Sequence, residues 1–269
     1  MKTARNRPCI VMLAAVALLG SRGALAQSSA AESTTVHLGL AARDIDTSDS
    51  TSVGELGLNA GATIPLGEWF AASLSASYAN ATVRTRDVLV DAGGTITGAR
   101  PSCDIDSSGG SAGLFVRRPS LGRVGASYGV GRLSSDCGDI SEFLASGTDE
   151  LDTEHYRAYG EVYLGDFTLG AAFTSMEPDG GEKLETTAVS ATWYPIESLR
   201  ITATGNDLYD RNAYGIVIEH QPDFMGDALG VYVGYETNEE SPRTGIISFG
   251  FAYHFGPRVP LQTRDRQYR

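Results

Sequence analysis

Large apolar residues alternate with small or polar ones along most of this chain. The clearest example is the segment 244–256, TGIISFGFAYHFG, in which every second residue from Ile247 to Phe255 is large and apolar. The residues between them are Ser248, Gly250, Ala252 and His254. A period of two places the large side chains on one face of a β-strand and the small ones on the other. The segment therefore predicts a strand with one apolar and one polar face.

The same alternation recurs along the chain and predicts about twelve strands. Most of them have close to the roughly 9–11 residues that a tilted strand needs to cross a bilayer. The expected strands are residues 34–42, 53–64, 68–79, 110–118, 123–133, 154–164, 166–176, 184–194, 198–207, 213–221, 228–236 and 244–255.

The connections between these strands alternate between short and long. The short ones are residues 65–67, 119–122, 165 and 195–197, and we assign the intermediate link 222–227 to the same side. The long, polar ones are residues 43–52, 80–109, 134–153, 177–183, 208–212 and 237–243. Tight turns at one end and long loops at the other are typical of antiparallel transmembrane barrels. An even number of strands places both termini at the end with the short turns.

A soluble β-sandwich is the alternative, because its strands also alternate. Two features favour the membrane. The strands are long and regular, and aromatic pairs adjoin the short turns, where a belt at the membrane interface would lie. These pairs are Trp69 with Phe70, Trp193 with Tyr194, and Tyr253 with Phe255. The predicted fold is thus all-β: a transmembrane up-and-down antiparallel β-barrel of about twelve strands.

The first 26 residues have the pattern of a secretory signal peptide. Basic residues precede an apolar run from Cys9 to Gly20, and Ala24-Leu25-Ala26 resembles a cleavage site. Removal of residues 1–26 leaves 17 basic and 33 acidic side chains, a net charge of −16. A chain this acidic lacks the basic surface that nucleic-acid binding requires, so we expect no nucleic-acid partner.

The pattern resembles that of the bacterial outer-membrane β-barrel superfamily, in the broad porin-like sense, over residues 34–256. Barrels of this kind end on a strand with alternating aromatics, as Phe251, Tyr253 and Phe255 do here. The resemblance implies a barrel domain over residues 27–256 in the outer membrane of a Gram-negative bacterium. Its implied partners are outer-membrane lipid and lipopolysaccharide, the barrel-assembly machinery and small solutes. The chain departs from the pattern by continuing past Gly256, and we expect residues 257–269 to be a disordered, basic periplasmic tail.

Charged and aromatic side chains occupy many inward positions of the predicted strands. Charge on the lipid face would cost about 2–4 kcal/mol for each Lys or Arg at mid-depth, so charged side chains are expected in the lumen. Two interpretations stay open: a polar network that fills a narrow barrel, or a constriction that selects solutes by charge. The predicted lumen-lining residues are Glu55, Arg117, His155, Arg157, Tyr159, Glu161, Arg200, Glu219 and Glu236, with Glu185 also assigned inward.

The long links are acidic, and residues 134–154 contain seven acidic residues and no Lys or Arg. These charges predict a weak preference for cations. We expect no enzymatic activity, because none of the four histidines stands in a catalytic motif. The sequence predicts no cofactor and no dedicated metal site. The expected function is a porin-like channel for passive diffusion of small hydrophilic solutes. The alternative is a non-conducting structural or surface-interaction barrel whose acidic loops bind a partner or divalent cations.

Two cysteines remain after the signal peptide, Cys103 and Cys137. They lie in the second and third long links, on either side of the hairpin 110–133. Both links emerge at the same end of an up-and-down barrel, and the periplasm is oxidising. The sequence therefore predicts a disulfide between them.

Overall fold

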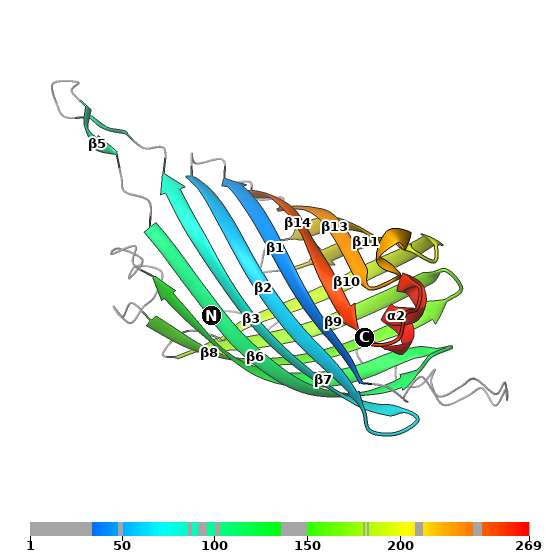
Figure 1. Ribbon diagram of the computed structural model, residues 1–269. Helices are drawn as coiled ribbons and strands as arrows, with labels where there is room; N and C mark the ends of the chain where they lie inside the picture. Colours follow the sequence, from blue (N-terminus) through cyan, green and yellow to red (C-terminus); the bar gives the residue numbers. More distant parts are fainter. Residues whose placement is uncertain are drawn as a thin grey trace.

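The computed structural model describes residues 34–47, 51–85, 88–90, 96–99, 103–135, 150–179, 181, 183–207, 212–238 and 244–268. Twelve strands form one closed antiparallel barrel, in which each strand pairs with the barrel strands before and after it (Figure 1). The pairing of the first and last strands closes the barrel, with Val36 opposite Phe255. The proposed signal peptide lies outside the described residues.

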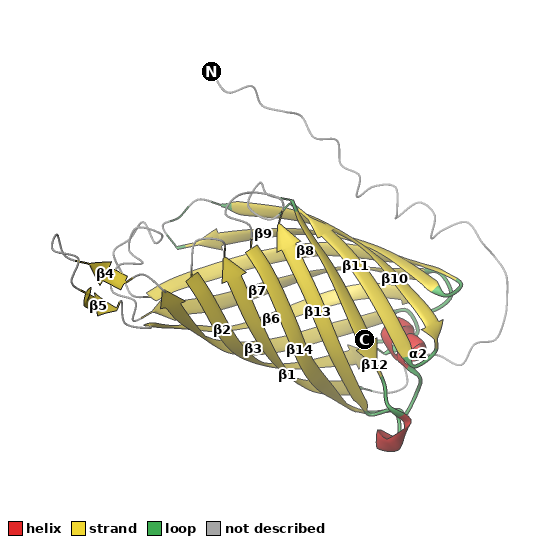
Figure 2. Ribbon diagram, turned by 90° about the horizontal axis from the view of Figure 1, so that it is seen from above, coloured by secondary structure: helices red, strands yellow, loops and turns green. Residues whose placement is uncertain are grey.

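The barrel strands are β1 (Thr35–Thr47), β2 (Thr51–Pro65), β3 (Phe70–Thr85), β6 (Cys103–Arg118), β7 (Gly122–Ser135), β8 (Glu150–Leu164), β9 (Phe167–Pro178), β10 (Leu184–Ile196), β11 (Leu199–Asn206), β12 (Ala213–His220), β13 (Leu229–Asn238) and β14 (Thr244–Phe255). A two-stranded sheet, β4 (Val88–Val90) and β5 (Ile96–Ala99), lies in the link between β3 and β6, beyond one end of the barrel (Figure 2). The predicted fold class and strand count are confirmed.

Several strands continue past their predicted ends on the long-loop side. The expected links 43–52 and 80–109 are partly strand, because β1 continues to Thr47 and β6 begins at Cys103. Past the apolar band the outward face becomes polar, as at Asp104 and Asp106. Backbone pairing continues there, but the apolar alternation that reveals a strand in the sequence does not.

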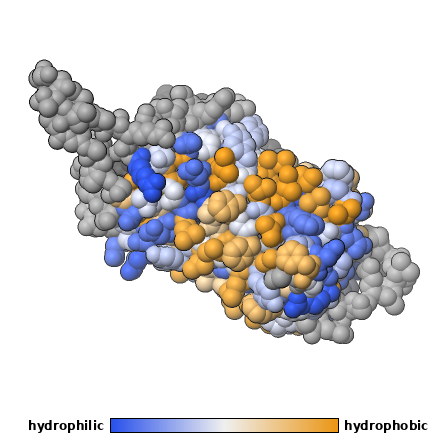
Figure 3. All heavy atoms as spheres, turned by 45° about the horizontal axis from the view of Figure 1, so that its top comes forward, coloured by the Kyte–Doolittle hydropathy of each residue, from blue (hydrophilic) through white to orange (hydrophobic). Residues whose placement is uncertain are grey.

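Most of the barrel strands have exposed, large apolar side chains. On the face that Figure 3 shows, apolar residues gather along the middle of the barrel and hydrophilic residues toward its two ends. Typical exposed apolar residues are Leu58, Leu114, Leu169, Val189, Val233 and Phe249, which are 47–63% exposed. Apolar surface of this extent on a closed barrel matches the lipid-facing band of outer-membrane barrels.

Two sets of exposed aromatic side chains border this band. On the short-turn side they are Trp69, Phe70, Phe167, Trp193 and Phe255, and on the long-loop side Tyr78, Tyr128, Tyr156, Tyr214 and Tyr235. From Phe70 to Tyr78 the chain rises about 27 Å along the strand, or about 20 Å along the membrane normal at a tilt of about 40°. That height is close to the hydrocarbon thickness that such aromatic girdles enclose. The predicted belt included Tyr194, but this residue points inward and is buried.

The C-terminal tail is not a disordered stub. Residues Leu261–Gln267 form helix α2, which lies at the short-turn end of the barrel (Figure 1). Leu261 is fully buried, and Thr35 donates a hydrogen bond of 2.7 Å to the carbonyl of Tyr268. The prediction failed because the anchoring groups come from strands far away in the sequence. Among the described residues, no helix is long and apolar enough to cross a membrane.

Candidate functional site

Helix α2 is held inside the barrel by a buried network of charged side chains. Arg200 of β11 binds Asp265 of α2 at 2.7 Å, and Tyr194 of β10 donates a hydrogen bond of 3.1 Å to the same carboxylate. Arg264 of α2 binds Glu219 of β12 at 2.8 Å, and Arg200 also contacts Glu219. Each charge therefore has an opposite partner, which offsets part of the cost of taking it out of water.

The register of the sheet builds the wall side of this network. Arg200 and Glu219 are cross-strand partners, and both belong to the inward set of alternating positions. The helix supplies the complementary pair, Arg264 and Asp265, from consecutive positions. Side chains of both the wall and the tail therefore meet at the short-turn end.

A second charged cluster lies across β6, β7 and β8. Arg117, Arg123 and Glu161 are successive cross-strand partners, and Arg123 binds Glu161 at 2.7 Å. Arg117 is 5% exposed and lies over the ring of Phe115, 5.3 Å from its centroid. Arg123 also lies near the ring of Tyr159, at 5.6 Å. Two arginines directly opposite each other repel, so this row concentrates positive charge at a cost in stability.

Aromatic rings link this cluster to α2. Arg266 of α2 lies 5.1 Å from the ring centroid of Tyr163 and 5.4 Å from that of Tyr194. It also donates hydrogen bonds to the carbonyl of Phe167 and the hydroxyl of Thr168, at 2.9 and 3.2 Å. Cation–π contacts with these rings stabilise guanidinium groups that have no carboxylate partner.

A cavity of about 630 Å³ lies inside the barrel next to both clusters. Its charged residues are Arg123, Arg157, Glu161, Arg200, Asp265 and Arg266. Much of the remaining lining consists of small or hydroxyl side chains, among them Ser127, Ser190, Thr202 and Thr204. The barrel interior thus contains polar space that water and small solutes can occupy.

The long-loop end has a different interior. Many inward positions of β3, β6 and β7 are small there, and a cavity of about 220 Å³ is lined by Ser75, Ser77, Gly109 and His155, among others. The ring of His155 lies where a side chain on Gly129 would be, 2.2 Å from the position of its Cβ atom. The absence of a side chain at Gly129 is therefore what lets this histidine lie against the wall.

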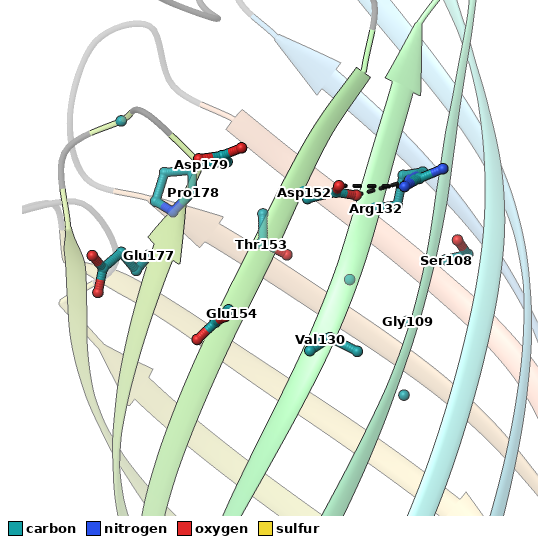
Figure 4. A pocket seen from close by; sticks show the side chains of 13 residues that line it. Ser108, Gly109, Val130, Arg132, Asp152, Thr153, Glu154, Glu177, Pro178 and Asp179 are labelled. Carbon is teal, nitrogen blue, oxygen red and sulfur yellow. Dashed lines mark hydrogen bonds and ion pairs between the residues drawn. The ribbon is translucent and has the colours of Figure 1, made fainter.

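At the rim of this end a hollow of about 1050 Å³ spans the tips of β6 to β9 (Figure 4). Arg132 and Asp152 form an ion pair across β7 and β8, with Nε and Oδ1 2.8 Å apart. They lie beyond the tyrosines that border the apolar band, and both are exposed. The hydrogen bond from Arg132 lowers the pKa of the Asp152 carboxyl group. Glu154 and Glu177 lie along the same rim (Figure 4).

The structure distributes the predicted lumen residues over the length of the barrel. Arg157, Tyr159, Glu161 and Arg200 meet at the larger inner cavity, while His155 lines the smaller one. Arg117 and Glu219 are buried toward the short-turn end. Glu55 accepts a hydrogen bond of 2.9 Å from Arg43, and Glu236 lies opposite Gly215. Glu185 was wrongly assigned inward: it lies on the same, outer face of β10 as the exposed Val189 and Trp193, and it pairs with Lys183 at the loop end.

Sequence reasoning missed several residues of the two clusters: Arg123, Tyr163, Tyr194, Arg264, Asp265 and Arg266. The alternation within residues 123–133 and 154–164 could have assigned Arg123 and Tyr163 to the inner face. Nothing in the sequence pattern indicates that Asp265 meets Arg200, because the two are 65 residues apart.

Two predicted features fall largely outside the described residues. Cys103 begins β6, but Cys137 is not described, so the disulfide stays a prediction. Most of the acidic link 134–154 is also not described. Within the described part of the chain, no group of three or more His, Cys, Asp or Glu side chains is placed to hold a metal ion.

No protein-family model matches the chain, and no curated protein matches it in sequence. Its structure resembles solved outer-membrane proteins. An outer-membrane channel from Pseudomonas putida F1 has a TM-score of 0.59 and 9% identity, over 82% of this chain and 95% of the channel. The chain has the fold of an outer-membrane β-barrel. The translocator domain of the autotransporter NalP from Neisseria meningitidis gives 0.51 and 13%, over 89% of this chain and 92% of that domain. The KdgM porin gives 0.50 and 8%, over 81% of this chain and 99% of the porin. At these identities the similarity of the barrel concerns its fold alone.

Proposed function

We propose that this protein is an outer-membrane channel for small hydrophilic solutes, narrowed at its periplasmic end by helix α2. The observation that carries the proposal is the polar cavity of about 630 Å³ inside a barrel with an apolar outer band. A barrel that is purely structural has no need of hydroxyl-lined space in its core. Two of the solved structures with this fold are named as a porin and as a channel, which agrees with the proposal.

The finer features of this proposal come from the sequence. Residues 1–26 direct export, the short turns face the periplasm and the long loops face outward. The barrel-assembly machinery inserts the chain, and the outer band contacts lipid and lipopolysaccharide. The channel acts by diffusion and carries out no chemical reaction.

The fixed position of α2 at the end of the barrel favours a second function, that of a non-conducting barrel. A tail fixed at the periplasmic end by Leu261, Arg264 and Asp265 would suit a closed barrel whose loops bind a partner or divalent cations. The acidic rim around Asp152, Glu154 and Glu177 would then be part of the binding surface.

Conductance of the refolded mature chain in planar bilayers distinguishes these functions. We expect discrete small steps from residues 27–269 and steps roughly threefold larger from a chain that ends at Gly256, because the narrowest section sets the resistance of a pore. Arg258→Gln is a matched control. It changes a residue of the tail outside α2, whose side chain donates a hydrogen bond to the carbonyl of Gly226. Liposome swelling with a neutral sugar gives an independent reading of solute passage. Folded barrel that conducts in neither form, with no swelling, would establish the non-conducting alternative.

A further inference from the structure

The charged side chains around the larger cavity do not balance. Its lining contains four arginines and two carboxylates, a net charge of +2, in a chain whose overall charge is strongly negative. Arg117, which is the cross-strand partner of Arg123, adds a further positive charge beside the cavity. The ion pair of Arg264 and Glu219 adds no net charge.

The excess is made by three guanidinium groups that have no carboxylate partner. Arg117 rests on Phe115, Arg157 lies near Tyr159 with 5.9 Å between its Cζ atom and the ring centroid, and Arg266 contacts a carbonyl, a hydroxyl and two rings. Arg157 has its side chain open to the lumen, whereas Arg117 is buried. Among the described residues, no ion pair engages any of the three.

These arginines and Arg123 lie among Tyr159, Tyr163 and Tyr194, and together they form what we call the arginine–tyrosine cluster. We propose that this cluster is an anion-binding constriction, and that the solutes of the channel are small organic anions carrying carboxylate or phosphate groups. The proposal rests on the proposed channel function and names its substrate class. Arg157 would meet the anion first, because it is the exposed member of the cluster. The hydroxyl groups of Ser190 on β10 and of Thr202 and Thr204 on β11 can donate further hydrogen bonds.

The fixed charge of the cluster outweighs that of the acidic loops. At physiological ionic strength, salt screens exposed loop charges beyond about 8 Å, whereas charges in a narrow channel surrounded by a low-dielectric bilayer are screened much less. An ion in the constriction lies directly among the arginines. Selectivity is therefore set by the cluster, and the weak cation preference expected from the acidic loops is replaced by a preference for anions.

The test combines ion selectivity with binding. In planar bilayers under a KCl gradient, we expect a chloride-to-potassium permeability ratio above one, and current block by citrate, a tricarboxylate. Arg157→Glu should lower the ratio below one. Arg157→Gln should raise the half-blocking concentration of citrate roughly tenfold, the effect of losing one charge-assisted hydrogen bond. Arg84→Gln is the matched control, since it removes the same charge from the outer face at the loop end, and both values should stay unchanged.

Calorimetric titration of citrate into the detergent-solubilised barrel measures anion binding independently of conductance. If the protein does not conduct but binds citrate, with weaker binding by Arg157→Gln, the channel function fails and the anion site stands. If it conducts with a preference for potassium and does not bind citrate, the channel stands and the anion site is wrong. Citrate binding that is identical in the wild type and Arg157→Gln would also overturn the assignment to this cluster.

Discussion

The two ends of the barrel are built from one pattern and filled in opposite ways. At the long-loop end of β3, β6 and β7 the inward side chains are small, such as Ser77, Gly109 and Gly131, and the ion pair of Arg132 and Asp152 is exposed. At the short-turn end they are large and charged, and a helix is packed among them. Alternation of two residues suffices to build the wall at both ends. What fills the lumen depends separately on the size of the residue at each inward position.

The ends also differ in what their ion pairs contribute. Arg132 and Asp152 have exposed side chains, and such pairs contribute little to stability. Arg264 and Glu219 are 5% and 6% exposed, so the loss of one partner leaves a buried charge without compensation. The short-turn end is thus the part of the barrel that single substitutions should damage most.

The largest expected effect is that of Glu219→Gln. Arg200 and Arg264 would both lose the carboxylate that they share, which should lower the free energy of unfolding by about 3–5 kcal/mol. Urea titration followed by tryptophan fluorescence measures this loss. Glu177→Gln, at an exposed position of the loop end, should change stability little. Equal losses in both variants would abolish the distinction between the ends.

The next effect concerns the predicted disulfide at the loop end. A bridge from Cys103 to Cys137 would close a loop of about 35 residues and stabilise the fold by roughly 3–4 kcal/mol in the entropic model. Mass spectrometry of non-reduced peptides should find the two cysteines joined. Reduction should then lower stability, whereas Glu219→Gln should lower it in either redox state. Free thiols in material from intact outer membranes would refute the bridge.

A third prediction tests the wall between the two ends. Leu74 and Ser75 are adjacent in β3 at the same depth, the first on the outer face and the second on the inner. Leu74→Arg should cost about 2–4 kcal/mol, because it places a charge in the hydrocarbon. Ser75→Arg should cost much less and should reduce conductance instead. Similar unfolding energies for the two variants would contradict the assignment of faces.

The smallest effect is expected for Arg132→Gln. This change should raise the pKa of Asp152 back toward 3.8, since the hydrogen bond from Arg132 lowers it. A lowered pKa in the fold means that any stabilisation is present above the unfolded value and is lost as the pH falls through the folded one. Carboxyl NMR titration measures the pKa, and unfolding at neutral pH should show little change. A large loss of stability there would remove the contrast with Glu219.

The orientation of most wall residues was predictable, because the alternation within each strand shows which side chains face outward. Val189 and Trp193 on β10, or Tyr159 and Glu161 on β8, follow from alternation alone, without knowledge of any neighbour. The errors lie where this local rule loses its signal. Glu185 and Asp104 stand beyond the apolar band, where the outward face is as polar as the inward one. Tyr194 was taken for a belt residue because an inward aromatic and an outward one look alike next to a turn.

The sequence by itself determined the class of fold, the number of strands and the face of most residues in the membrane. The physical reason is that lipid demands an apolar outer surface and full backbone pairing, so a periodic pattern admits few other solutions. Only the tertiary structure decided what fills the lumen. It brought Asp265 to Arg200, set Arg117 opposite Arg123 and left Arg157 open to the cavity. These contacts join segments that are distant in the chain, and they depend on sheet register and on the seat of one helix, neither of which has a local signal.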